Sequence, residues 1–326
     1  MIDITYENFQ TELIDASTRV PVLLDIWAEW CGPCKSLGPV LEQLEVEYAG
    51  RFILAKVNAD QYAEIAQQLS KMFGVRSIPF CVMFKDGNPI DGFVGALPAE
   101  QIRGFLDQHV ASEDALASAE ETAQAEAAMA EGQTASAHEL LQDALARDPG
   151  NDEARFDLIK LQIAEGDLDG ARATFEPMAN RAQGPVPEMR VSAFGRYIEA
   201  FATARQARAP SALAAAIEAN KRDFEARFEL ACMFIAVGRF PQAMDELLEI
   251  IMRDKAWSDE LARKTYIALL EVMSAPPVKP APSKAPAPGA AAADGKPKLE
   301  LTGKMETNPT DPVIEQYRRK LSMALF

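Results

Sequence analysis

Cysteine and histidine are scarce in this sequence. Its 326 residues include four cysteines and two histidines. So few cysteines exclude the framework of structural disulfides that small secreted domains use. They leave room for one reactive pair, and such a chain is expected to work in a reducing compartment, the cytoplasm.

Positive charge and long apolar segments are also in short supply. The chain has 33 Lys and Arg against 49 Asp and Glu, which gives a net charge of −16. Such an acidic chain is a poor partner for nucleic acid or for an anionic membrane surface. No apolar run approaches the ~20 residues that a membrane-spanning helix needs. The opening MIDITYENFQ has no basic segment followed by an apolar core, so we expect no signal peptide.

Two of the cysteines form the run WCGPC at residues 30–34, directly after the strand-like segment from Val22 to Trp27. A helix that begins near Cys34 directs its unpaired N–H groups and the positive end of its dipole at Cys31, which favours a thiolate there. The thiolate attacks disulfides, and this spacing lets Cys34 resolve the mixed disulfide that Cys31 forms. The pattern predicts a dithiol oxidoreductase, and a reducing compartment favours a reductase.

Half of a zinc site has the same spacing. A structural zinc ion would need two more ligands, and the further thiols and imidazoles are Cys81, Cys232, His109 and His138. None of these forms a second closely spaced pair. We therefore expect no metal and no cofactor beyond the redox-active disulfide. Cys81 and Cys232 lie among apolar residues and are interpreted as buried thiols, with a redox role for either left open.

A charged residue interrupts the apolar strand before the cysteines. Asp25 has apolar neighbours, so its side chain is expected inside the protein, where a carboxylate is costly unless it is paired or useful. Lys56, in the next strand-like run FILAKVNAD, is the expected partner. Pro79, in the sequence SIPF, precedes another strand-like run and suits the first residue of a strand or a turn beside the thiols.

Residues 1–110 resemble thioredoxin along their whole length. The matching pieces are DIWAEWCGPCK, the helix proline Pro39, KVNAD, the SIP proline, FKDG and FVGAL. The resemblance implies an α/β thioredoxin fold, with a mixed, mostly antiparallel central sheet flanked by helices. It implies that Cys31 is the nucleophile and Cys34 the resolving thiol. Asp25 would be the buried proton acceptor, with Lys56 beside it.

The same resemblance implies how client proteins dock. Pro79 would be a cis-proline that guards the site and pairs with a client's backbone. A flat apolar rim would surround the thiols, formed by Trp30, Gly32, Pro33, Ile78, Gly95 and Ala96. Trp30 could also be a core residue, but its place beside the nucleophile favours the surface.

After Val110 the sequence changes character. Residues 115–273 are rich in Ala, Glu, Leu and Arg and show helical periodicity. The segment EARFDLIKLQIAEGDLDGA from Glu153 returns 72 residues later as EARFELACMFIAVGRFPQA from Glu225. Small residues recur at related positions in three places: Gly132, Gly166 and Gly238, and Ala137, Ala171 and Ala243. This pattern resembles degenerate tetratricopeptide (TPR) repeats and predicts an all-α repeat domain, with a divergent unit around 185–220.

The end of the chain has two parts. Residues 275–306 include a Pro/Ala/Lys-rich tract that predicts an extended tether. Residues 307–326 contain DPVIEQYRRKLSMALF, in which Asp311 suits an N-cap and Pro312 a first helical position. Its apolar stripe predicts an amphipathic helix. This helix is either a cap on its own repeats or a ligand for a partner's groove.

A thioredoxin-like domain, TPR-like repeats and a terminal helix together resemble the bacterial chaperedoxins, the YbbN or CnoX type of thioredoxin-like co-chaperone. The resemblance implies a holdase that binds unfolding or oxidised proteins, protects or reduces their cysteines, and hands them to the chaperonin GroEL or to the DnaK system. Thioredoxin reductase is a further partner to be expected. The chaperonin contact would be the terminal helix, through Val313, Ile314, Tyr317, Arg318, Arg319, Leu321 and Leu325. The alternative is a conventional protein-disulfide reductase whose repeats recruit one dedicated substrate.

Overall fold

The computed structural model describes residues 1–183, 185–274 and 311–325, which form two compact units. The first unit contains residues 1–112, and the second contains residues 113–274 together with 311–325. The predicted tether at 275–306 and the first residues of the terminal segment lie outside the described residues. No helix in the described ranges combines the length and the apolar character needed to span a membrane.

The first unit is built on a five-stranded sheet with the order β1-β3-β2-β4-β5. The strands are β1 (Ile2–Asp3), β2 (Val22–Trp27), β3 (Ile53–Asn58), β4 (Phe80–Lys85) and β5 (Asn88–Val94). Strand β3 runs parallel to β1 and β2, whereas β4 runs antiparallel to β2 and β5. The sheet is therefore mixed, as predicted, but its pairings divide evenly and are not mostly antiparallel.

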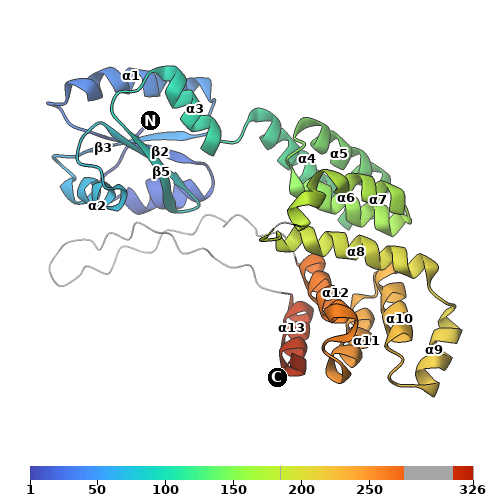
Figure 1. Ribbon diagram of the computed structural model, residues 1–326. Helices are drawn as coiled ribbons and strands as arrows, with labels where there is room; N and C mark the ends of the chain where they lie inside the picture. Colours follow the sequence, from blue (N-terminus) through green and yellow to red (C-terminus); the bar gives the residue numbers. More distant parts are fainter. Residues whose placement is uncertain (184, 275–310, 326) are drawn as a thin grey trace. The chain divides into compact units, whose positions relative to one another are not determined.

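Helices cover both faces of this sheet (Figure 1). Helices α1 (Gly32–Glu47) and α3 (Ala99–His109) cover one face, where Leu23 and Met83 pack with Leu41 and Leu106. Helix α2 (Ala63–Phe73) and the short helical turns η1 (Phe9–Asp15) and η2 (Ala16–Thr18) cover the other. The alternation of side chains along a strand assigns neighbours to opposite faces. Asp25, two residues after Leu23, therefore lies beneath α1, the helix that begins at the cysteines.

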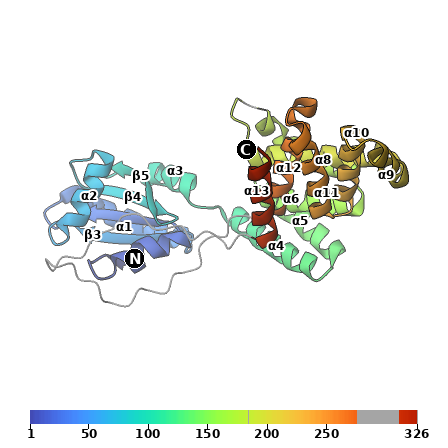
Figure 2. The same cartoon turned by 90° about the horizontal axis from the view of Figure 1, so that it is seen from below.

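The second unit is entirely helical in its described residues. Its helices are α4 (Glu113–Ala130), α5 (Thr134–Arg147), α6 (Asp152–Glu165), α7 (Leu168–Phe175), η3 (Glu176–Ala182), α8 (Met189–Gln206), α9 (Pro210–Ala219), α10 (Phe224–Ala236), α11 (Phe240–Arg253), α12 (Trp257–Met273) and α13 (Pro312–Leu325). Helices α8 and α9 occupy the stretch for which the sequence predicts a divergent unit. Neighbouring helices along the chain pack together in three places, α4 with α5, α6 with α7 and α10 with α11, whereas α8 packs on α10 and α12 (Figure 2).

The repeat seen in the sequence is also a repeat of contacts. Asn151 caps α6 and Asp223 caps α10, each accepting a hydrogen bond from the backbone N–H three residues later. The buried Arg155 and its counterpart Arg227 each donate to a backbone carbonyl six residues upstream. The three turn glycines have positive φ, from 70° to 83°, and the three repeat alanines are fully buried. Positive φ favours glycine, and close helix packing favours alanine, so the sequence pattern had a structural cause.

Candidate functional site

The cysteine pair lies at the N-terminus of α1 as a disulfide, with the two Cα atoms 5.3 Å apart. Cys31 is the N-cap residue, and its Sγ accepts a hydrogen bond of 3.2 Å from the backbone N–H of Cys34. Gly32 and Pro33 form the first two helical positions, where the missing N–H of a proline costs nothing. The helix thus directs N–H donors at the sulfur of Cys31, which is the arrangement that stabilises a thiolate.

The segment around Pro79 lies against the disulfide. The Ile78–Pro79 peptide bond is cis, and Ile78 packs on the cluster that contains both cysteines. The backbone N–H of Gly95 donates to the carbonyl of Pro79 over 2.8 Å, which joins the loop after β5 to this segment. Residues far apart in the sequence are therefore gathered at one edge of the sheet, around the sulfur atoms.

The predicted docking rim is accessible in part. Trp30 is 71% exposed, and its indole Nε1 donates to Oδ2 of Asp60 at 2.9 Å. Gly32, Pro33 and Ala96 are also exposed, whereas Ile78 and Gly95 are half-buried and Pro79 is buried. The structure places Trp30 on the surface and not in the core. The client-binding role of these residues stays a prediction.

Asp25 is buried below this surface. Its side chain is 1% exposed, and burial raises the pKa of its carboxyl from 3.8 to about 6, against the opposing effects of the Lys56 charge and of a hydrogen bond from Cys81. A carboxyl with this pKa changes its protonation state close to neutral pH and can therefore accept a proton there.

Lys56 differs from its expected role in one respect. It lies opposite Asp25 in the parallel register of β2 and β3, as a partner should. Its Nζ, however, forms an ion pair with Oε1 of Glu42 on α1, at 2.7 Å. Lys56 therefore acts on Asp25 through its charge, and the direct hydrogen bond to Asp25 comes from Cys81.

The other two cysteines are buried and unpaired with each other or with the active pair. Cys232 packs inside the helical unit, where burial, followed by the charge of Glu229, raises the pKa of its thiol to about 12. Such a thiol is almost entirely protonated at neutral pH, which argues against the redox role left open above. Across the described ranges, no three His, Cys, Asp or Glu side chains gather into a metal site.

Comparisons with known proteins agree with this geometry. The thioredoxin family model matches residues 1–108, and two tetratricopeptide repeat models match residues 128–190 and 203–280. The thioredoxin of Chlorobaculum thiosulfatiphilum is 47% identical over 106 residues, which are 32% of this chain and 93% of that protein. The chain belongs to the thioredoxin family. Thioredoxin C-2 of Corynebacterium nephridii is 42% identical over 110 residues, 34% of this chain and 96% of that protein.

The thioredoxin domain is thus followed by TPR repeats, as the sequence predicted. The family and the Cys31–Cys34 disulfide together identify a dithiol oxidoreductase domain. The thioredoxin domain carries the redox pair, and the two repeat models match most of the rest of the chain.

The terminal helix α13 packs on the TPR repeats, beside α12 (Figures 1 and 2). Ile314 and Tyr317 are almost fully buried there, at 3% and 5% exposure. The Tyr317 hydroxyl lies 3.1 Å from the carbonyl of Pro241 and 3.2 Å from Oδ1 of Asp245. The Tyr266 hydroxyl in turn donates to the Tyr317 carbonyl over 2.7 Å. The helix therefore caps its own repeats, in agreement with the first of the two sequence interpretations.

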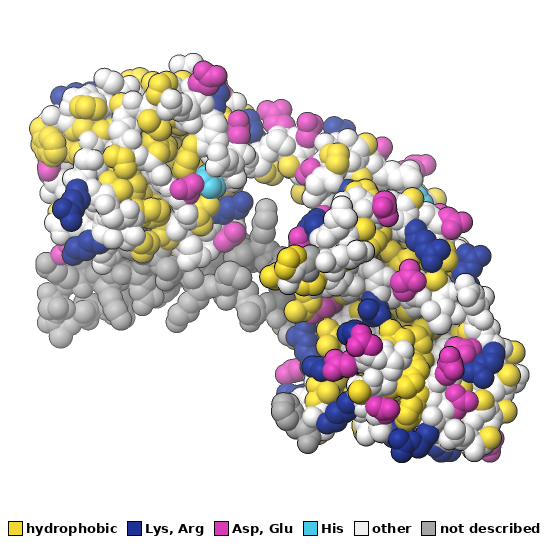
Figure 3. All heavy atoms as spheres, viewed as in Figure 1, with side chains coloured by type: hydrophobic (Ala, Val, Ile, Leu, Met, Phe, Trp, Pro, Cys, Tyr) yellow, Lys and Arg dark blue, Asp and Glu magenta, His cyan; other side chains and the backbone are white. Residues whose placement is uncertain are grey.

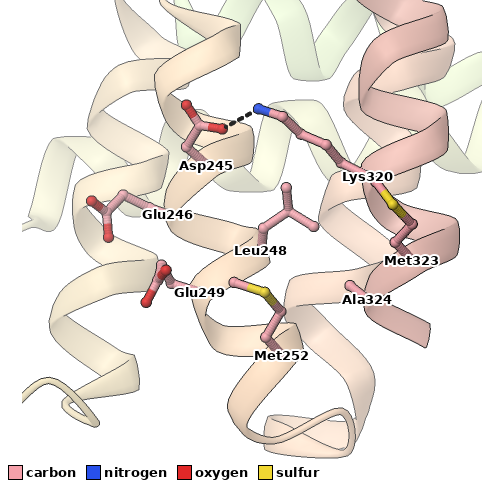
Figure 4. Close-up of a pocket in the computed structure, with 8 residues that line it drawn as sticks. All are labelled: Asp245, Glu246, Leu248, Glu249, Met252, Lys320, Met323 and Ala324. Atoms are coloured by element: carbon pink, nitrogen blue, oxygen red, sulfur yellow. Dashed lines mark hydrogen bonds and ion pairs between the residues drawn. The ribbon is translucent and has the colours of Figure 1, made fainter. Parts of the chain in front are cut away.

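The interface between α13 and the TPR repeats is open along one side (Figure 4). A groove of about 640 Å³ separates the second half of α13 from α11, and Met252 and Met323 line it with more than half of their surface exposed. Lys320 reaches across the groove to Asp245, at 3.0 Å. This ion pair is accessible to water, so it adds little to the attachment and weakens with salt. The buried side chains of Ile314 and Tyr317 consequently provide most of the attachment, and Tyr317 adds the polar contacts.

We expect replacement of Tyr317 by Ala to release α13. The change removes the buried aromatic ring and leaves the Tyr266 hydroxyl beside a mobile carbonyl. Hydrogen–deuterium exchange of residues 312–325 should accelerate at least ~10-fold, because the helix loses its attachment. Arg319→Ala is the matched control on the exposed side of the same helix, and it should leave the exchange unchanged. Equal protection in the two variants would show that Tyr317 is not the anchor.

Sequence reasoning missed three residues of these sites. Cys81 forms a hydrogen bond with Asp25, and Glu42 forms an ion pair with Lys56. Asp245 accepts a hydrogen bond from Tyr317 and forms an ion pair with Lys320. Each lies on a different element from its partner, at least 14 residues away in the sequence. The alternation pattern could have placed Cys81 on the same face as Asp25 only if the pairing of β2 with β4 had been known.

Proposed function

We propose that this protein is a thioredoxin-like co-chaperone of the chaperedoxin type. It binds unfolding or oxidised proteins in the cytoplasm, exchanges disulfides with their cysteines through Cys31 and Cys34, and delivers them to GroEL or to the DnaK system. The observation that carries the proposal is the combination, in one chain, of a complete redox pair, a repeat array and a separate terminal helix.

The redox part is supported by the geometry around α1. Cys31 at the helix N-terminus is the nucleophile that attacks a client disulfide, and one client thiol leaves. Cys34 then gives its proton to Asp25 and attacks the sulfur of Cys31, which releases the second client thiol. Two electrons pass to the client, and Cys31–Cys34 becomes the disulfide seen here. Thioredoxin reductase would return the pair to the dithiol form.

The holding part is supported by apolar surface on the TPR repeats. A groove of about 430 Å³ lies between α8 and α12, and Met189, 65% exposed, lines it beside Pro187 and Ile267. Figure 3 shows apolar side chains on this unit as a band among basic and acidic ones. Exposed apolar surface bordered by charges is typical of sites that bind proteins.

The delivery part is supported by the way α13 is attached. Val313, Arg318 and Arg319 remain exposed on the docked helix and are free to meet a chaperonin, whereas Ile314 and Tyr317 are covered. A partner can therefore bind the whole apolar stripe only if α13 detaches from the TPR repeats. Only Ile314 and Tyr317 of the described helix are fully covered, which makes such a release feasible, and the cap and the partner ligand become two states of one helix.

A pull-down from bacterial lysate tests the proposal. The Cys34→Ser variant should trap many clients as mixed disulfides on Cys31, and it should retain GroEL. Removal of residues 307–326 should abolish GroEL capture and leave the trapped clients. The double variant Cys31→Ser, Cys34→Ser is the control, since it should trap none covalently yet still suppress aggregation of unrelated unfolded proteins at near-stoichiometric ratio.

The same experiment separates the alternative, a conventional disulfide reductase with a dedicated substrate. That reading predicts one dominant disulfide-linked partner, no chaperonin with or without the tail, and no protection from aggregation by the double variant. Such a result would refute the co-chaperone role and leave only the reductase.

A further inference from the structure

Cys81 lies directly across the sheet from the buried carboxylate. Asp25 on β2 and Cys81 on β4 are register partners in the antiparallel ladder, so their side chains lie on the same face. Both are shielded from solvent, with 1% and 0% exposure, under α1 and α3. The Sγ of Cys81 lies 3.7 Å from Oδ1 of Asp25, within the range of a hydrogen bond from a thiol.

A carboxylate in such a place needs donors, because its ionised form loses the solvation of water. Lys56 supplies positive charge but makes its ion pair with Glu42. Among the described residues, Cys81 is the side chain that the structure places in hydrogen-bond contact with Asp25. The thiol therefore has a direct effect on which protonation state of the carboxyl is favoured.

Cys81 is suited to this role by being unreactive. Burial, followed by the neighbouring Asp25 charge, raises the pKa of its thiol well above 9.0. It therefore keeps its proton at neutral pH and remains a donor, because a thiolate there would repel the carboxylate. The same burial separates it from oxidants and clients, so a direct redox role is disfavoured.

We propose that Cys81 is a positioning residue for disulfide exchange: its thiol donates a hydrogen bond to Asp25, orients this carboxylate and favours its ionised, proton-accepting form. The proposal rests on the proposed redox function, in which Asp25 takes the proton of Cys34 when Cys34 attacks the mixed disulfide. Cys81 touches neither the client nor the reacting sulfur atoms and acts through Asp25 alone.

The test is a titration of the Asp25 carboxyl by carbon-13 NMR in the full-length, oxidised protein. Cys81→Ala and Cys81→Val both remove the donor, and Val also fills the space that Ala leaves. We expect the Asp25 pKa to rise by about half to one pH unit in both, since a thiol is a weak donor. Cys81→Ser restores a donor of similar size and should return the pKa to its wild-type value or below.

Met83→Leu is the matched control, because Met83 lies on the same face of β4 and packs in the same core. It should leave the Asp25 pKa unchanged. The rate at which the mixed disulfide is resolved provides a second readout: its acid limb should move to higher pH in the Ala and Val variants by the amount seen in the titration, and recover in Ser.

An unchanged or lowered Asp25 pKa in both Cys81→Ala and Cys81→Val overturns the proposal, even if the protein reduces disulfides at full rate. A shift of the same size in Met83→Leu also overturns it, because the effect would then come from packing. The disulfide-reduction rate of the wild type tests the proposed function separately. A wild type without that activity refutes the function, whereas the titration decides on the Cys81–Asp25 contact in either case.

Discussion

Replacement of Cys31 by Ser is expected to lower the rate of insulin disulfide reduction at least about a thousandfold. Serine at the N-cap can still accept the hydrogen bond from the Cys34 backbone, so the start of α1 should be preserved. A neutral hydroxyl, however, does not attack a disulfide, and Cys34 is 4% exposed in the disulfide. The measurement is insulin reduction with dithiothreitol as the electron source.

Cys34→Ser should behave differently from Cys31→Ser, since it keeps the nucleophile and loses the resolving thiol. One equivalent of mixed disulfide should accumulate per chain, and turnover should stop there. Cys232→Ala is the control, because this buried thiol lies in the other unit and should leave turnover intact. Equal activity in wild type and Cys31→Ser would show that the exchange does not use this pair.

The second large effect concerns stability. Asp25→Asn is expected to stabilise the thioredoxin domain by about 3 kcal/mol above pH 7, because the native pKa of about 6 exceeds the ordinary 3.8. Below about pH 3 the carboxyl is protonated in both the folded and the unfolded chain, so the two proteins should be equally stable. Between about pH 3 and pH 6 the unfolded chain loses its proton first, and the wild type loses stability as the pH rises.

Urea unfolding of the oxidised protein at pH 3.0 and pH 7.5 checks this expectation. The chain has three tryptophans, and Trp27 and Trp30 both lie in the thioredoxin domain. In a Trp257→Phe background, fluorescence therefore reports on that domain alone. Asp60→Asn is the matched control, since Asp60 is an exposed carboxylate near the same site. A gain from Asp25→Asn that is equal at both pH values would contradict a raised pKa in the native state.

The Asp25→Asn variant separates the stability of the domain from its activity. The ionised carboxylate of Asp25 lowers the free energy of unfolding at neutral pH. A buried group that destabilises the fold in this way is a candidate for a chemical role. Asp25→Asn should accordingly slow the resolution of mixed disulfides while it strengthens the domain. Such opposite changes are typical of catalytic groups in strained or desolvated surroundings.

The sequence predicted local features well because local physics decides them. WCGPC predicts a helix that begins near Cys34, and α1 begins two residues earlier, at Gly32, with Cys31 as its N-cap. Positive φ at turns favours glycine, and tight helix contacts need small side chains, so the repeat of glycine and alanine was readable without coordinates. The fold class, with a thioredoxin domain followed by TPR repeats, followed from these patterns together with the resemblance.

The directions in which the strands pair and the partners of the charged side chains were harder to predict from the sequence. The expectation of a mostly antiparallel sheet was wrong, because the pairing of strands depends on the path of the chain between them. Lys56 was the expected partner of Asp25 and lies opposite it in the sheet, but its flexible side chain forms its ion pair with Glu42 on α1. The partner of a long, flexible side chain depends on which acceptors lie near it, and these come together only when the chain folds.

The sequence by itself determined where the reactive pair lies, which segments form helices and strands, and where one domain gives way to repeats. All of these depend on residues within a few turns of each other. Only the tertiary structure decided that Cys81 donates to Asp25 and that Tyr317 anchors α13 between Pro241 and Asp245. Those contacts join residues 56 or more positions apart, and they depend on strand register and helix packing, which no local pattern encodes.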